Sequence, residues 1–175
     1  MRVGSGGVVA AIQMPTVNGR TLYVVNGVRY RDLKRGVGHF PGTALPGQYG
    51  NAALAGHRTT YGAPFGDLDE LQPGDPIIIE TANGGHYEYI VDSKEIVDPS
   101  NVGVLAQPSD PKVVELTLST CHPKHSTAKR LIVHASLDRY HSSAVGKRRV
   151  SYSKKKPAPP KGVRATTTTT STLAP

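Results

Sequence analysis

Short strand-like segments separated by turn signals most restrict the fold that this chain can adopt. The clearest pair is PIIIE at residues 76–80 and HYEYIVDSKEIV at residues 86–97, which flank an Asn-Gly-Gly turn at residues 83–85. An Asn-Gly pair between β-branched and aromatic runs is the typical signal of a β-hairpin. We therefore predict an antiparallel hairpin here, and Asn-Gly at residues 18–19 predicts a second one near the start of the chain.

The remaining segments are short and show no strand–helix–strand rhythm. Further strand-like segments are residues 8–13, 21–25, 51–57, 113–118 and 131–135, short helical turns are expected within residues 28–35 and 64–71, and residues 39–51 and 98–111 are expected to form loops. The chain has 19 Gly, 14 Pro and only 6% aromatic residues, which favours many turns over a helix bundle. Because a closed barrel leaves no strand edge unpaired, we predict a mainly β fold, a barrel of roughly eight strands with one or two short helices.

The net charge of +8 is not spread evenly along the chain. Residues 139–175 hold nine of the 21 Lys and Arg and none of the 13 Asp and Glu, so residues 1–138 have a net charge of −1. A nearly neutral domain does not favour nucleic acid as a partner. The basic C-terminal region is expected either to be solvated or to contact anionic lipid or wall polymer.

Composition also divides the chain into parts. The C-terminal region is rich in Lys, Pro and Thr, and such a segment cannot bury enough apolar surface to order itself. We expect a linker or expression remnant over residues 1–6, one domain over residues 7–140 and a disordered tail over residues 141–175. No run approaches the ~20 apolar residues of a membrane span, so a membrane anchor is expected to lie upstream of this chain.

Cys121 is the only cysteine, and it lies between the strand-like segments 113–118 and 131–135. A lone cysteine most often behaves as a small buried hydrophobe. This one, however, follows polar residues, precedes a His-Pro pair that breaks a strand, and is followed by a polar connection with several cations. Such surroundings stabilise a thiolate, so we predict a nucleophile at a strand end.

A cysteine nucleophile needs a partner that favours the thiolate and donors for the developing oxyanion. His57 follows Gly56 at the end of another strand-like segment, where its ring would be exposed. Arg130 opens the strand after Cys121 and carries a planar fork of donors. His122 is expected to face away from Cys121, because neighbouring strand residues point to opposite faces. The alternative for His57 and Arg130 is an ordinary surface role.

A zinc site is a competing interpretation of the same region. Cys121, His122 and His125, with His57 or His86, supply the ligand types. Structural zinc sites usually contain paired Cys or His sets at short spacing, and this pattern is a weak match. We therefore expect no metal and no other cofactor.

The residues around these candidates resemble a known family. TLSTC at 117–121, Arg130 nine positions after Cys121, and His57 within AGHRTTYG at 55–62 are similar to the sortase family of cysteine transpeptidases. Residues 38–75 and 121–135 look closest to class E sortases of high-GC Gram-positive bacteria. The resemblance covers about residues 8–138 and implies an eight-stranded sortase barrel with His57, Cys121 and Arg130 as the catalytic set.

The resemblance also implies an activity. Cys121 would attack the Thr carbonyl of a sorting signal, for class E Leu-Ala-x-Thr-Gly, and the acyl group would pass to an amine of a peptidoglycan precursor. The protein partners would be surface proteins with C-terminal sorting signals, met at the extracytoplasmic face of the membrane. The residues expected to bind the signal are Thr120, Tyr61, Val102, Val104 and Leu105.

Two other functions stay open from the sequence. A cysteine peptidase would pass the acyl group of the same type of motif to water, and the order of His and Cys in the chain does not separate it from a transpeptidase. A non-enzymatic β-barrel module would bind the cell wall through the basic tail.

Overall fold

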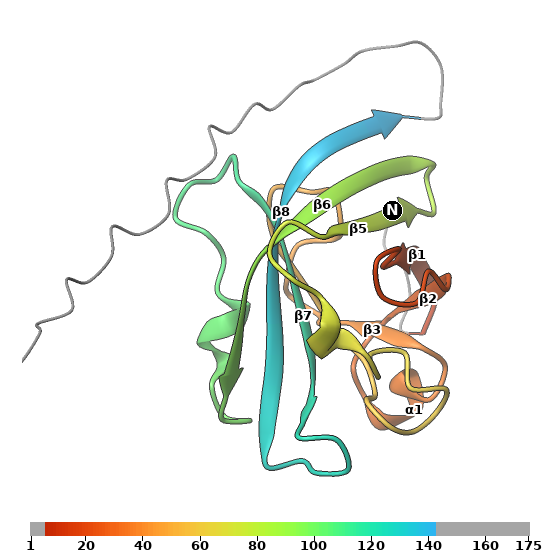
Figure 1. Cartoon of the computed structure of the whole chain (residues 1–175). Helices are drawn as coiled ribbons and strands as arrows, with labels where there is room; N and C mark the ends of the chain where they lie inside the picture. The colour runs from red at the N-terminus through yellow and green to blue at the C-terminus, as the bar shows by residue number, and fades with distance from the viewer. Residues whose placement is uncertain (1–5, 143–175) are drawn as a thin grey trace, which may run out of the picture.

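The computed structural model describes residues 6–142, and the statements below refer to that part of the chain. Eight strands close into one barrel in the spatial order β1-β2-β3-β4-β7-β8-β6-β5 (Figure 1). The strands are β1 (Val8–Gln13), β2 (Leu22–Asn26), β3 (Val37–His39), β4 (Gly50–Ala55), β5 (Pro76–Thr81), β6 (Gly85–Val97), β7 (Val114–His122) and β8 (Lys129–Ser142). One helix, α1 (Tyr30–Leu33), and two 3₁₀ helices, η1 (Leu68–Glu70) and η2 (Val102–Leu105), lie in the connections. The predicted mainly β, eight-stranded barrel is therefore confirmed.

The strand β3 was not predicted. The sequence indicated a helical turn within residues 28–35 and a loop from residue 39, with no strand between them. Val37–His39 instead pair parallel to β2 and antiparallel to β4. A strand of three residues is too short to show a period of two. At Gly38 an added Cβ would lie 2.3 Å from the carbonyl oxygen of Gly27, so this glycine is required by close strand packing.

The helix predicted within residues 64–71 is reduced to the single 3₁₀ turn η1. Phe65, Leu68 and Leu71 are spaced three residues apart, and all three are fully buried in the barrel core. Spacing by three residues suits a 3₁₀ turn as well as an α-helix, which is why the sequence alone did not separate the two.

Both predicted hairpins are present, as β1–β2 and β5–β6. β6 continues past β5 and pairs with β8 along its length, with two bulges that bend the ladder. On β7, Leu116 and Leu118 point into the core and are fully buried. The outward-facing Thr117 is also buried, at 1% exposure, because the connection between β6 and β7 covers it.

That connection, residues 98–111, contains η2 and is fastened to the start of β4. The Asn51 amide donates to the carbonyls of Val104 and Ala106 at 3.3 and 3.2 Å. The Gln107 amide donates to the Asn51 carbonyl at 3.1 Å. The loop is therefore held against the outer face of the sheet by side-chain amides.

Within residues 6–142, no helix has the length and hydropathy that crossing a bilayer would require. The predicted tail lies almost wholly outside the described residues, as do residues 1–5 of the predicted linker.

Candidate active site

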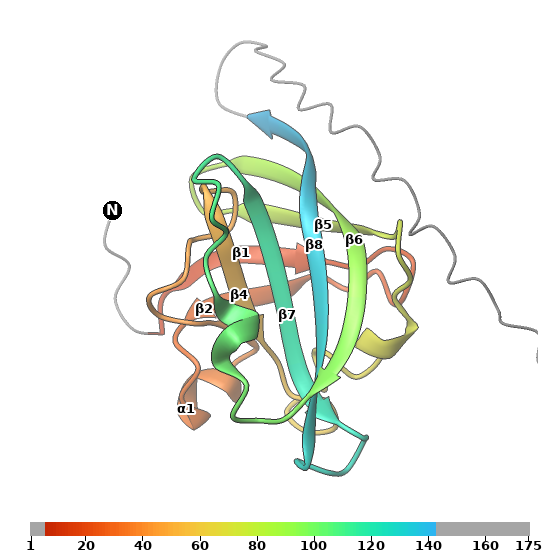
Figure 2. The ribbon, with the colours of Figure 1, turned by 90° about the vertical axis from the view of Figure 1, so that its left-hand side faces the viewer.

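Cys121 lies one residue before the end of β7, and the neighbouring strand β4 brings His57 to it. β4 runs parallel to β7 with Ala55 opposite Ser119. The Gly56 N–H continues this pairing by donating to the Ser119 carbonyl at 3.1 Å. His57, two residues beyond Ala55, is therefore level with Cys121, two residues beyond Ser119. Figure 2 shows β4, β7, β8 and β6 side by side.

On the other side of β7, the antiparallel strand β8 brings Arg130. Cys121 and Arg130 are directly paired, and paired residues of neighbouring strands have side chains on the same face, with Cα atoms about 5 Å apart. Arg130 also pairs with Val97, the last residue of β6. The register therefore places His57, Cys121, Arg130 and the end of β6 in one row.

This row lies on the outer face of the barrel. Leu118, Thr120 and Leu131 face inward and are 0%, 2% and 5% exposed. Cys121 and Arg130, at the alternate positions, are half-buried. A thiol and a guanidinium are thus presented together at a strand end beside a loop.

The environment of His57 affects its protonation. Partial burial lowers the pKa of His57 from its ordinary value of 6.5, because an apolar environment disfavours the charged ring. Its Nε2 is enclosed and has no hydrogen-bond partner among the described residues. Burial therefore favours the neutral ring, and the ring is not committed to a structural bond through that nitrogen.

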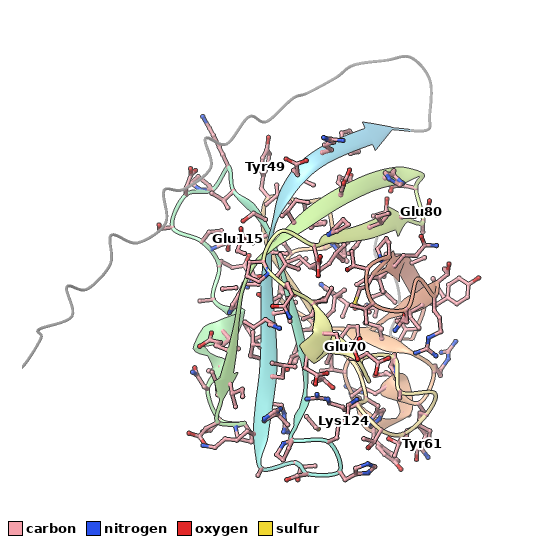
Figure 3. The ribbon with its side chains drawn as sticks, viewed as in Figure 1. Tyr49, Tyr61, Glu70, Glu80, Glu115 and Lys124 are labelled. Atoms are coloured by element: carbon pink, nitrogen blue, oxygen red, sulfur yellow. The ribbon has the colours of Figure 1, made fainter. Side chains whose placement is uncertain are left out.

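Tyr61 packs on His57 and links it to α1. The rings of His57 and Tyr61 have centroids 5.0 Å apart, and the Tyr61 hydroxyl hydrogen-bonds the Tyr30 hydroxyl. The Lys34 ammonium lies 4.3 Å from the Tyr30 ring centroid and 5.3 Å from that of Tyr61. In Figure 3, Tyr61 lies at the same end of the molecule as Lys124 of the β7–β8 connection. Tyr30 and Lys34 were not predicted from the sequence, because contacts between loops have no local signal.

Arg130 is held by its own loop. Its Nη1 donates to the carbonyls of Thr127 and Lys129, both at 3.0 Å. Lys129 in turn forms an ion pair with Asp98 at 2.7 Å, which ties the start of the β6–β7 connection to the start of β8. No described residue bonds to Nη2 or Nε of Arg130, so part of the fork remains open beside Cys121.

His122 does not turn toward the row of catalytic candidates. Its Nδ1 accepts a hydrogen bond of 3.1 Å from Nη1 of Arg58. Arg58 follows His57 in the chain and is itself buried. This arginine was not predicted from the sequence, since nothing in the sequence marks an arginine after a strand as buried.

The residues expected to bind the signal are placed in different environments. Thr120 is buried, and its hydroxyl donates to the Gly56 carbonyl at 2.8 Å, so it supports the segment before His57 and is not placed to contact a substrate. Tyr61 is 43% exposed and Val102 is 72% exposed. Val104 and Leu105 are half-buried, as expected for residues that also hold their loop on the barrel.

The zinc interpretation finds no support in the described part of the chain, where no group of three or more His, Cys, Asp or Glu side chains could hold a metal ion. His86 lies at the start of β6, beside Glu80 at 3.5 Å. Cys121 lies at the level of the other end of that strand, where Val97 is.

Comparisons with known proteins identify the family. The model of the sortase domain matches residues 12–138. Sortase SrtE1 of Streptomyces coelicolor is 38% identical over an alignment of 116 residues. The match covers 58% of this chain and 32% of that protein, so it spans about a third of this relative.

Solved structures that are similar to this chain also belong to the sortase family. Sortase E from Streptomyces avermitilis has a TM-score of 0.71 and 34% identity, over 83% of this chain and 97% of that one. Sortase E1 from Streptomyces coelicolor with a tripeptide in the active site has a TM-score of 0.72 and 31% identity, over 82% of this chain and 95% of that one. The resemblance read from residues 55–62 and 117–130 is thereby confirmed, with class E proteins among the similar chains, and the chain belongs to the sortase family.

Proposed function

We propose that this protein is a cysteine transpeptidase that cleaves a sorting signal between Thr and Gly and transfers the acyl part to an amine. One observation carries the proposal: the strand register aligns His57, Cys121 and Arg130 in one row on the outer face of a sortase barrel. Membership of the sortase family supports the reaction class.

In the first half-reaction, the Cys121 thiolate attacks the carbonyl carbon of the signal's threonine. Open N–H groups of Arg130 stabilise the oxyanion or bind a neighbouring substrate carbonyl. The C–N bond to glycine then breaks, and protonated His57 gives its proton to the leaving amine. The products are a thioester on Cys121 and a free peptide that begins with glycine.

In the second half-reaction, an amine enters in place of the departed peptide. Neutral His57 takes a proton from this amine as it attacks the thioester carbon. The C–S bond breaks, Cys121 leaves as a thiolate, and a new amide forms. If water attacks instead, the same residues perform hydrolysis, which is the peptidase alternative.

The lowered pKa of His57 shapes the pH dependence of this reaction. Because burial disfavours the protonated His57 ring, the form with a thiolate and a protonated ring is expected to be a minority of the enzyme. The rate should therefore be bell-shaped in pH. A rate that stays flat from mildly acidic to strongly basic pH would rule out this pair of roles.

The expected signal is Leu-Ala-x-Thr-Gly, carried by surface proteins, with a peptidoglycan precursor amine as acceptor at the extracytoplasmic face of the membrane. Class E proteins among the similar chains support this specificity. Exposed surface for the signal lies at Tyr61, whose ring packs on His57, and at Val102 in the β6–β7 connection, which begins at the Asp98–Lys129 ion pair. Thr120 is left out of this surface because it is buried.

A peptide assay tests the proposal. Leu-Ala-x-Thr-Gly and Leu-Pro-x-Thr-Gly peptides are incubated with and without a glycine-based amine, and products are identified by mass. A new amide in the presence of the amine supports a transpeptidase, and the acid product alone with amine present would support the peptidase. A higher kcat/KM for the Pro peptide would contradict the specificity. A wall-binding activity that survives in Cys121→Ala, with no turnover in the wild type, would support the binding module.

A further inference from the structure

Arg58 is the one arginine among the described residues that is buried, with 4% of its surface exposed. A buried charge is costly unless it is paired and hydrogen-bonded. Nη2 of Arg58 forms an ion pair of 2.8 Å with Oδ1 of Asp69 in η1, whose side chain is 46% exposed. One half of the guanidinium fork thus balances the charge and leaves the other half for a different contact.

The other half of the fork contacts the end of β7. Nη1 donates to the Cys121 carbonyl oxygen at 3.2 Å and to Nδ1 of His122 at 3.1 Å. Because arginine has donors and no acceptor, His122 presents an unprotonated Nδ1 to it. Arg58 therefore holds the backbone of Cys121 and leaves the sulfur free.

This contact is made where the backbone ladder ends. β4 and β7 are paired from Gly50 to Ala55, and the Gly56 N–H makes the last backbone bond between the two segments that the described residues show. His57 and Cys121 lie beyond that bond. Arg58, the residue after His57, supplies a side-chain link at this level and adds a third segment through Asp69.

We propose that Arg58 is a positioning residue that fixes the end of β7, and with it Cys121, relative to His57. The proposal rests on the proposed transpeptidase function. The planar guanidinium contacts Asp69 through one nitrogen and the Cys121 carbonyl through another, a geometry that a lysine ammonium does not reproduce. Because Arg58 is covered, it acts through Cys121 and His57 and does not touch the substrate.

The first test compares three conservative variants. Arg58→Lys keeps the charge and loses the fork, and Asp69→Asn keeps the shape and loses the ion pair. Arg139→Lys, on a side chain that is 66% exposed near the far end of β8, is the matched control. We expect kcat for peptide transfer to fall about 100-fold in Arg58→Lys and about 10-fold in Asp69→Asn, since small displacements of reacting groups have effects of this size.

The changes in kcat and KM distinguish a positioning role of Arg58 from a role in substrate binding or in stability alone. We expect KM to stay within about twofold, because an interaction that does not touch the substrate changes kcat, and Arg139→Lys to leave both constants unchanged. An unchanged kcat in Arg58→Lys, or a loss of rate fully accounted for by a smaller folded fraction in a thermal melt, would overturn the proposal. If Arg58→Lys does not fold, Asp69→Asn alone decides in the same way.

The second test needs no peptide. Cys121 is the only cysteine, so its alkylation by iodoacetamide, followed across pH by mass, reports one thiol. We expect an inflection from His57 in the wild type that is lost in Arg58→Lys and in His57→Gln and kept in Arg139→Lys. If the wild type turns over no peptide but this pattern holds, the proposed function fails and the positioning role stands. If Arg58→Lys keeps the wild-type inflection, the positioning role fails.

Discussion

The two ends of the barrel are held together in different ways. At the end that carries Cys121, ion pairs fasten the connections: Lys124 with Asp67 joins the β7–β8 and β4–β5 connections, Lys129 with Asp98 joins the start of β8 to the β6–β7 connection, and Arg58 with Asp69 lies within the β4–β5 connection. At the other end, where Figure 3 shows Tyr49, a hollow of about 380 Å³ is lined by Tyr49, Tyr87 and Tyr140. There the Tyr87 and Tyr140 rings stack at 4.7 Å on directly paired residues of β6 and β8.

The two ends need different interactions to hold their strands together. At the tyrosine end the strands are already paired by their backbones, so apolar and aromatic packing is sufficient to close it. At the Cys121 end, His57 and Cys121 lie past the last backbone bond between their segments, and charged side chains supply the missing links. Changes at the Cys121 end should therefore affect catalysis, and changes at the tyrosine end should affect stability.

The largest effect is expected from Cys121→Ala. Without the sulfur no thioester forms, so turnover of the peptide with the amine should fall below detection, while the thermal melt should stay close to that of the wild type because the site is half-buried. Product formation is measured by mass spectrometry. Turnover in this variant above a no-enzyme control would contradict the role of Cys121.

Arg130→Lys should have the next largest effect. The charge remains but the planar fork is lost, and removal of one oxyanion donor typically lowers kcat by about 100-fold. The measurement is kcat/KM with the same peptide, and Arg139→Lys toward the tyrosine end serves as control. Full activity in Arg130→Lys would remove Arg130 from the site.

Gly47→Ala probes the tyrosine end. Gly47 has φ +84°, and an added Cβ would lie 2.2 Å from the Tyr87 ring. Strain together with overpacking should lower the free energy of unfolding by about 2 to 4 kcal/mol, measured by urea denaturation. The kcat per folded molecule should not change. A loss of kcat in the folded variant would show that the tyrosine end is coupled to the Cys121 end.

We expect a smaller effect of pH on the free energy of unfolding. Burial lowers the pKa of His39 from its ordinary 6.5, and partial burial does the same for His57. The unfolded chain therefore binds more protons below pH 6.5, so stability should be complete above that pH and should be lost as pH falls toward the folded-state pKa values. The slope of unfolding free energy against pH should be smaller in His39→Gln. An equal slope in that variant would contradict this origin.

The smallest effect is expected from deletion of residues 143–175. The composition of this region forbids a core of its own, and the eight strands lie within residues 8–142. A protein ending at Ser142 should melt and turn over peptide like the full chain. Loss of folding or of turnover on this deletion would show that the tail contributes to the domain.

Local features of the sequence predicted much of the fold and part of the site. The Asn-Gly turns at residues 18–19 and 83–84 specify hairpins through neighbours in the chain, and both hairpins form. Cys121 and Arg130 face each other because the loop between them is short. These hairpins and this pairing depend only on residues close together in the chain, so the sequence is sufficient to predict them.

Other relationships depend on distant contacts. Nothing local sets His57 level with Cys121, because this follows from parallel pairing between β4 and β7. His57 was predicted as the partner from its place at a strand end, and the family resemblance implied the same pair. Arg58 was missed because its burial depends on η1 and the end of β7 folding around it. The strand β3 was missed because its three residues form a strand only between β2 and β4.

The most direct test of the central claim is the intact mass of the protein during turnover of a Leu-Ala-x-Thr-Gly peptide. We predict a transient adduct with the mass of the peptide up to threonine, located on Cys121 by fragmentation, which disappears on addition of an amine as the new amide appears. We also predict no adduct in Cys121→Ala and a slowly formed one in Arg130→Lys. An adduct on any other residue, or amide product formed without an adduct on Cys121, would contradict the account.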